Sequence, residues 1–156
     1  MKKVIALALV FMLAACGVDG KQKITDAYNL SDTEHVFELI SMDELEETIK
    51  NRPVSYVYFG SPICPACVNM TPRINQHAKD AGISVVYYVE FRYDSEMARE
   101  WSQNGTYDYR GTPLVATFLY DEFERSNFTD LPQGGDYEPN IIDMFETYGC
   151  GCVATS

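Results

Sequence analysis

Two cysteines separated by two residues, Cys64-Pro65-Ala66-Cys67, stand between a strand pattern and a helix pattern. The aromatic and β-branched run over residues 56–59 is typical of a buried strand, and the Gly-Ser-Pro sequence at 60–62 ends it. A helical pattern begins at the cysteines, so we expect Cys64 at a helix N-terminus. Unpaired backbone N–H groups and the positive end of the helix dipole there favour a thiolate, which is the nucleophile in disulfide exchange.

The first residues of the chain resemble a bacterial lipoprotein signal. Met1-Lys2-Lys3 precedes an apolar run over residues 4–15, which is short for a membrane span. The run ends in Leu13-Ala14-Ala15-Cys16-Gly17, which is similar to the lipobox, in which the cysteine is lipidated. We therefore expect a signal peptide over residues 1–15 and a lipid, such as palmitate, on Cys16. The alternatives are a plain cleaved signal, an uncleaved anchor and a buried helix.

The rest of the chain is expected to divide into three parts. Residues 16–31 are polar with few apolar side chains, which predicts a tether between lipid and domain. Residues 32–149 suit one domain with a sizeable core, and residues 150–156 form a short tail. The expected location is extracytoplasmic, on a membrane-anchored lipoprotein at the cell surface or the periplasmic side.

Charge and cysteine usage limit the partners. The chain has 12 basic and 23 acidic residues and a formal net charge of −11, so no basic patch for nucleic acid or anionic lipid is expected. Membrane attachment would come from the lipid on Cys16. The remaining cysteines form two close pairs, Cys64 with Cys67 and Cys150 with Cys152. Export would place these pairs where disulfides persist.

Hydrophobic periodicity predicts an α/β domain. Strands are expected over residues 36–40, 54–59, 83–89, 114–120 and 123–128, and helices over about 41–50, 64–81, 95–103 and 139–148. Ser41 and Glu44 have the spacing of a capping box at the start of the first helix. The order βαβαβαββα predicts a three-layer fold, a central mixed sheet with helices on both faces.

Over about residues 35–148, the chain resembles the thioredoxin superfamily. The Cys-x-x-Cys motif follows the second strand, Pro72 lies eight residues after Cys64, and Thr112-Pro113 stands just before the fourth strand. The resemblance implies that Pro72 kinks the helix and that Pro113 follows a cis peptide bond and packs against the two cysteines. The sequence around the motif, residues 59–67, is similar to the bacteriocin transport accessory group of thioredoxin-like proteins.

Two positions depart from thioredoxin itself. The buried aspartate that the resemblance implies six residues before the first cysteine is Tyr58, and the tryptophan before that cysteine is Ile63. Another base or water would therefore deprotonate Cys67. Glu90, at the end of the third strand, is one candidate, and a solvated carboxylate without that role is the alternative.

The predicted function is thiol–disulfide exchange. Cys64 would attack a substrate disulfide, and Cys67 would resolve the mixed disulfide. Ile63, Pro65 and Ala66 beside the cysteines are expected to contact substrate. By resemblance, Thr112 and Pro113 line the same groove, where the Thr112 backbone pairs with an extended segment.

Tyr107 and Tyr109 would extend the apolar rim that Ile63 begins, or would be ordinary core aromatics. The expected partners are cysteine-containing exported proteins or peptides and a redox partner that recharges the site. The alternative function is a non-enzymatic accessory protein that holds a peptide for export.

The tail pair Cys150-Gly151-Cys152 has three interpretations: a second dithiol that exchanges with Cys64 and Cys67, a strained local disulfide, or half of a metal site. No metal is predicted, because His35 and His77 lack Cys or His partners at zinc spacing. No cofactor is expected, because the sequence contains neither a phosphate-binding loop nor a haem-attachment motif.

Overall fold

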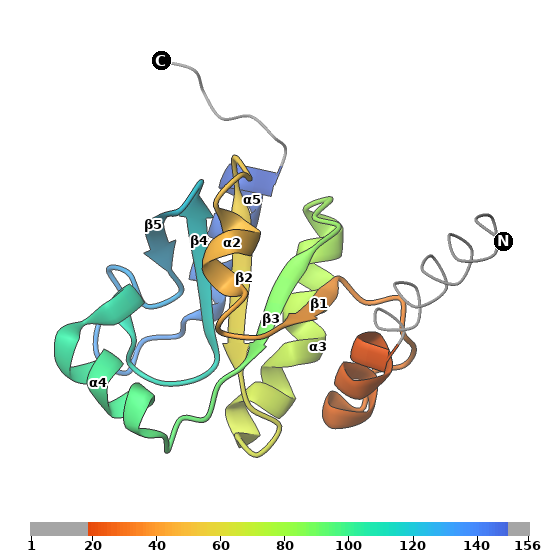
Figure 1. Ribbon diagram of the computed structural model, residues 1–156, viewed down its shortest axis with the longest axis horizontal. Coiled ribbons are helices and arrows are strands. Elements are labelled where there is room, and N and C mark those ends of the chain that lie inside the picture. The colour runs from red at the N-terminus through yellow and green to blue at the C-terminus, as the bar shows by residue number, and fades with distance from the viewer. Residues whose placement is uncertain (1–18, 150–156) are drawn as a thin grey trace, which may run out of the picture.

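A five-stranded mixed sheet forms the centre of the computed structural model, which describes residues 19–149 (Figure 1). The strand order is β1-β3-β2-β4-β5. The first three strands pair in parallel, and β4 is antiparallel to both β2 and β5. The strands are β1 (Phe37–Ile40), β2 (Ser55–Gly60), β3 (Val86–Glu90), β4 (Leu114–Leu119) and β5 (Glu122–Ser126).

Helices cover both faces of the sheet, and the predicted element order is confirmed. The helices are α2 (Leu45–Ile49), α3 (Pro65–Asp80), α4 (Glu96–Asn104), the short 3₁₀ helix η1 (Thr106–Asp108) and α5 (Glu138–Gly149). Residues 19–28 are also helical. Figure 1 shows α2 in front of the sheet and α3 and α5 behind it. The fold is therefore the predicted α/β sandwich of three layers.

Alternation along β2 divides the core into two clusters. Tyr56 and Tyr58 face α3 and α5, whereas Val57 and Phe59 face α2 and α4. Every residue of β2 is buried, as expected for a strand in the middle of a sheet that is covered on both faces. Burial of this strand fixes the position of the residues that follow it, which begin at Ser61.

The capping box predicted from Ser41 and Glu44 forms, but it lies in the turn before α2. The Glu44 carboxylate accepts from the Ser41 N–H at 2.8 Å, and the Glu44 N–H donates to the Ser41 hydroxyl at 3.3 Å. The helix begins at Leu45, later than predicted, and its N-cap Glu44 makes no side-chain cap hydrogen bond. The Ser95 hydroxyl caps α4 by accepting from the Ala98 N–H at 3.1 Å. Gly105 ends α4 with a φ of 68°, a conformation that favours glycine.

The tether predicted over residues 16–31 is wrong for residues 19–28. These residues form a helix, and its side chains Ile24 and Tyr28 are 1% and 2% exposed in the core cluster beneath α3. The Tyr28 hydroxyl bonds to that of Tyr88 at 2.8 Å. The folded domain therefore begins before residue 32. Within residues 19–149, no helix is long and apolar enough to cross a membrane.

Replacement of Tyr28 by alanine should lower the free energy of unfolding by about 3 kcal/mol, because it opens a cavity in the core and removes the bond to Tyr88. Asp26→Ala, on the exposed side of the same helical segment, is the matched control and should change stability by less than about 0.5 kcal/mol. Urea unfolding measures both changes. Equal, small effects would mean that the segment is a tether in solution.

Candidate functional site

Cys64 lies at the junction of β2 and α3. It is the N-cap of α3, with extended backbone angles of −91° and 114°, and Pro65 follows at the first helical position. The Cys64 sulfur accepts a hydrogen bond from the Cys67 N–H at 3.3 Å. The predicted position at a helix N-terminus is confirmed, and the sulfur lies where a negative charge is stabilised by free N–H groups.

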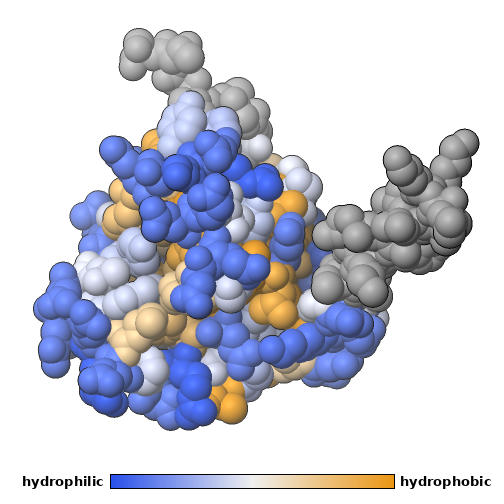
Figure 2. All heavy atoms as spheres, in the orientation of Figure 1, coloured by the Kyte–Doolittle hydropathy of each residue, from blue (hydrophilic) through white to orange (hydrophobic). Residues whose placement is uncertain are grey.

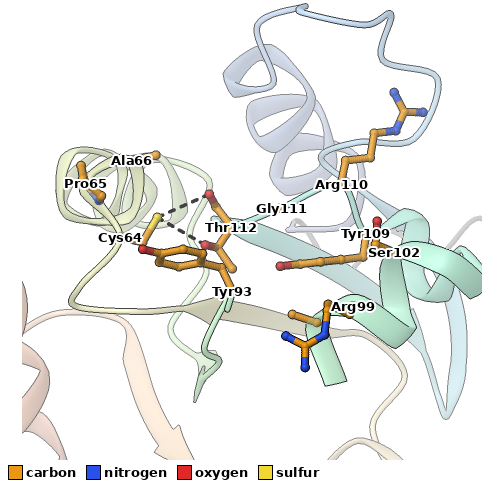
Figure 3. Close-up of a pocket in the computed structure, with 11 residues that line it drawn as sticks. Cys64, Pro65, Ala66, Tyr93, Arg99, Ser102, Tyr109, Arg110, Gly111 and Thr112 are labelled. Carbon is orange, nitrogen blue, oxygen red and sulfur yellow. Dashed lines mark hydrogen bonds between the residues drawn. The ribbon is translucent and has the colours of Figure 1, made fainter. Parts of the chain in front are cut away.

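The loop before β4 brings Thr112 against Cys64 from the other side (Figure 3). The Thr112 hydroxyl donates to the Cys64 sulfur at 3.3 Å, and the thiol faces the Thr112 carbonyl oxygen at 3.6 Å. The Thr112–Pro113 peptide is cis, as the resemblance implies. Pro113 is buried, and its carbonyl accepts from the side-chain amide of Asn127 at 3.2 Å.

The two thiols have opposite electrostatic environments. Burial alone would raise the pKa of Cys64, but hydrogen bonds from Cys67, from the Thr112 hydroxyl and from backbone N–H groups outweigh it and hold the pKa below its ordinary value. Burial raises the pKa of Cys67 to about 11, and its hydrogen bond to Cys64 adds to the rise. Cys64 is therefore the thiol of the pair that loses its proton more readily.

Tyr58 occupies the position where the resemblance implies an acid. Its hydroxyl bonds to that of Thr71 at 2.7 Å, and Thr71 in turn donates to the Cys67 carbonyl oxygen at 2.7 Å. Burial raises the pKa of Tyr58 well above its ordinary value, so the phenol stays neutral. Tyr58 therefore anchors the first turns of α3 through Thr71 and does not serve as a base.

Gly60 is required by the close approach of this ring. A Cβ at Gly60 would lie 2.5 Å from Cζ of Tyr58, which is closer than atoms can approach without movement. The Gly60 carbonyl accepts from the Tyr88 hydroxyl at 3.2 Å. Tyr28, Tyr58 and Tyr88 thus form a buried aromatic cluster beneath the turn that carries Cys64.

Glu90, the candidate base, forms an ion pair with Lys23 at 3.1 Å, and both side chains are solvent exposed. Glu90 is therefore a solvated carboxylate at the end of β3, which is the alternative interpretation given for it above. Within residues 19–149, no group of three or more His, Cys, Asp or Glu side chains is arranged to hold a metal ion.

A pocket of about 720 Å³ opens beside Cys64 (Figure 3). Four residues expected to contact substrate line it, namely Cys64, Pro65, Ala66 and Thr112. Tyr109, expected at an apolar rim, also lines it and is only 6% exposed.

Two other expected rim residues lie elsewhere. Ile63 is 56% exposed next to Cys64 but does not line this pocket. Tyr107 packs among Phe59, Trp101 and Phe118. It is therefore an ordinary core aromatic, which is the second of the two interpretations given for it above.

The sequence did not predict the opposite wall of the pocket. Tyr93, from the loop after β3, and Arg99 and Ser102, from α4, form this wall, and Arg110 lies beside Tyr109. One signal could have found the wall. Because β2 and β3 are parallel neighbours, the segments after both strands lie at the same edge of the sheet.

The second cysteine pair, Cys150 and Cys152, lies outside the described residues. The three interpretations given for this pair stay predictions.

Thr112→Val should raise the pKa of Cys64, because the thiolate loses a hydroxyl donor while the side-chain volume stays the same. At a pH below the pKa, the thiolate fraction should fall roughly fivefold, which corresponds to about 1 kcal/mol. The pH dependence of alkylation by iodoacetamide measures this as a curve displaced to higher pH. Thr117→Val is the control, since the buried Thr117 hydroxyl has no hydrogen-bond partner among residues 19–149. An unchanged curve for Thr112→Val would contradict the assignment.

Comparisons with known proteins support the fold. No family model matches the chain, and no curated protein matches it. Among solved structures, thioredoxin from Plasmodium falciparum aligns with a TM-score of 0.50 and 16% identity, over 70% of this chain and 97% of that chain. Thioredoxin O2 from Arabidopsis thaliana, in its oxidised state, gives a TM-score of 0.49 and 15% identity over 73% and 95% of the two chains. Malassezia sympodialis thioredoxin aligns with a TM-score of 0.48 and 18% identity, over 72% of this chain and 91% of that chain. The alignment with Plasmodium falciparum thioredoxin and the mixed five-stranded sheet show that the chain has a thioredoxin-like α/β fold.

Proposed function

We propose that the protein is a thiol–disulfide oxidoreductase that acts through Cys64 and Cys67. The observation that carries the proposal is the contrast between the two thiols. Cys64 caps α3 and receives hydrogen bonds that favour its thiolate, whereas Cys67 is fully buried behind it and keeps its proton. The similarity to thioredoxins supports the fold, and the chemistry rests on this geometry.

The reaction has two exchanges. The Cys64 thiolate attacks one sulfur of a substrate disulfide, a new S–S bond forms, and the other substrate sulfur leaves as a thiolate that takes a proton. Cys67 then loses its proton to water and attacks Cys64, which closes the Cys64–Cys67 disulfide and releases the second substrate sulfur. Two electrons pass from the cysteine pair to the substrate. The reverse sequence oxidises a dithiol.

Substrate binding is assigned to the pocket beside Cys64. Thr112 bonds to the attacking sulfur, and its backbone offers pairing groups to an extended segment that carries the target cysteine. Pro65 and Ala66 form the adjacent wall. The substrates are cysteine-containing exported proteins or peptides, and a separate redox partner recharges the pair. Sulfur exchange needs no cofactor.

The competing function is a binding protein that holds a peptide in the same pocket without redox chemistry. The resemblance of residues 59–67 to the bacteriocin transport accessory group favours that alternative. It differs from the first proposal in one respect, because it does not need the Cys64 and Cys67 sulfur atoms.

Cys64→Ser should lower the rate of insulin disulfide reduction by at least roughly 100-fold, because a hydroxyl does not form the mixed disulfide. Cys67→Ser should instead accumulate a mixed disulfide on Cys64, since the resolving thiol is missing, and a mass spectrum would detect the adduct. All proteins in the assay carry Cys150→Ser and Cys152→Ser, so that the measured exchange comes from Cys64 and Cys67 alone. Full biological activity of a Cys64→Ser/Cys67→Ser protein would contradict the redox proposal and favour the binding alternative.

We further propose that the domain is held at the outer face of a membrane by lipid on Cys16. The support is the lipobox-like sequence over residues 13–17, which lies outside the described residues. The charge of the chain does not supply this attachment, because a net charge of −11 gives no electrostatic attraction to anionic lipid.

Labelling of expressing cells with radioactive palmitate should mark the wild-type protein and leave Cys16→Ser unlabelled. The variant should also move from the membrane fraction to the soluble fraction, because a lipid supplies the membrane affinity. Cys64→Ser is the control for nonspecific thioester labelling and should keep the label. Equal labelling of Cys16→Ser and wild type would rule out Cys16 as the lipid attachment site.

A further inference from the structure

The charged side chains that line the pocket beside Cys64 are both arginines. Arg99 comes from α4 and Arg110 from the loop before β4, and no Asp or Glu lines the pocket. The chain as a whole has the opposite balance, with 23 acidic and 12 basic residues. In Figure 2, hydrophilic residues cover much of the face that α2 and α4 form. The pocket is therefore a locally positive site on an acidic protein.

Neither arginine forms an ion pair with a carboxylate within residues 19–149. The Arg99 guanidinium donates to the Asp94 main-chain carbonyl at 3.3 Å, and Arg110 donates to the Leu131 carbonyl at 2.5 Å. The Asp94 carboxylate is held by two hydrogen bonds from Arg92 and acts on Arg99 only through its charge. Glu96 and Glu100, which lie in α4 itself, form no ion pair with Arg99 within residues 19–149. Both pocket arginines therefore keep donors and a full charge for a ligand.

The other described arginines are occupied. Arg73, Arg92 and Arg125 each form an ion pair with a carboxylate. Arg52 lies over the ring of Tyr87, with its guanidinium carbon 5.2 Å from the ring centroid, away from Cys64. Three described arginines thus form no ion pair with a carboxylate, and two of them, Arg99 and Arg110, line the pocket beside Cys64.

Aromatic side chains complete the pocket. Tyr93 is 46% exposed, and Figure 3 shows its ring beside Cys64 and Thr112, with the Tyr109 hydroxyl directed toward it. Arg99 lies below these rings, and the Arg110 guanidinium points toward the loop that holds Leu131. Because the Arg110 guanidinium is held by the Leu131 carbonyl, Arg99 is expected to contribute more than Arg110.

We propose that this pocket selects substrates in which a carboxylate lies within a few residues of the reacting disulfide sulfur. The inference rests on the proposed function, because it names the substrate class for the same exchange at Cys64. Arginine suits this task, since its planar guanidinium can bind both oxygens of a carboxylate. The carboxylate belongs either to an acidic residue beside the cysteine of a polypeptide or to a small disulfide that itself carries carboxylates.

The net charge of −11 does not cancel this selectivity. At about 0.1 M salt, exposed charges more than about 10 Å apart are largely screened, so remote acids act weakly on a bound substrate. A contact between guanidinium and carboxylate inside the pocket is screened less. Exposed pairs contribute up to about 1 kcal/mol, which corresponds to a rate preference of roughly threefold to fivefold.

The test compares three disulfide-linked, dye-labelled peptide pairs that are identical except for one residue near the cysteine, which is Glu, Gln or Lys. The reduced protein should react in the order Glu, Gln, Lys at low salt. The ratio of the Glu rate to the Gln rate should fall about threefold in Arg99→Gln and less in Arg110→Gln. A ratio within each variant cancels any general loss of activity. Arg52→Gln is the matched control and should keep the wild-type ratio.

The outcomes separate this inference from the proposed function. Equal rates for the three peptides, or a preference for Lys, would overturn the inference while leaving thiol exchange intact. A Glu preference that survives Arg99→Gln/Arg110→Gln would also overturn it, because the arginines would not be the site. Failure to reduce any peptide would instead contradict the proposed function. The rate at which the reduced protein reduces oxidised glutathione, a small disulfide that carries carboxylates, is measured in parallel. If only this rate depends on Arg99 and Arg110, the selected carboxylate belongs to a small disulfide and not to a polypeptide.

Discussion

The antiparallel pairing of β2 with β4 is the constraint on which the site depends. Phe59 is opposite Leu114 in this ladder, so the residues that follow Phe59 and those that precede Leu114 meet at one edge of the sheet. This brings together Cys64 and Thr112, which are 48 positions apart in the chain. Both strands are buried in the middle of the sheet, and a shift of one residue would exchange their two faces. The register of the core therefore fixes the contact between sulfur and hydroxyl.

Asymmetry between the thiols follows from the same arrangement. Cys64 lies at the N-terminal end of α3, where the helix and Thr112 supply hydrogen-bond donors. Cys67 lies one turn further along the helix and is fully buried. The first position stabilises negative charge and the second penalises it. Tyr58 adds no base, because its hydroxyl is committed to Thr71. In the proposed reaction, this asymmetry makes Cys64 the attacking thiol, and the proton of Cys67 passes to water.

The parts of the fold that local patterns determine could be predicted from sequence. The strands, the start of α4 and the place of Cys64 at the start of α3 each depend on neighbouring residues, such as the Ser95 cap or Pro65 after Cys64. The helix over residues 19–28 could not be found this way. Ile24 and Tyr28 are isolated apolar residues in a polar segment, and only the distant Tyr58 and Tyr88 give them a core to join.

The walls of the pocket also divide into one that neighbouring residues determine and one that only the tertiary structure determines. Cys64, Pro65 and Ala66 belong to one motif, whereas Tyr93 and Arg99 reach the pocket because β3 is a parallel neighbour of β2. No local pattern distinguishes Arg99 from the paired Arg92, since both are arginines near the same aspartate. Their roles differ because Arg92 takes the Asp94 carboxylate and leaves Arg99 only a carbonyl. In an acidic chain, an arginine without an ion pair beside Cys64 therefore depends on how nearby ion pairs are distributed, which tertiary structure decides.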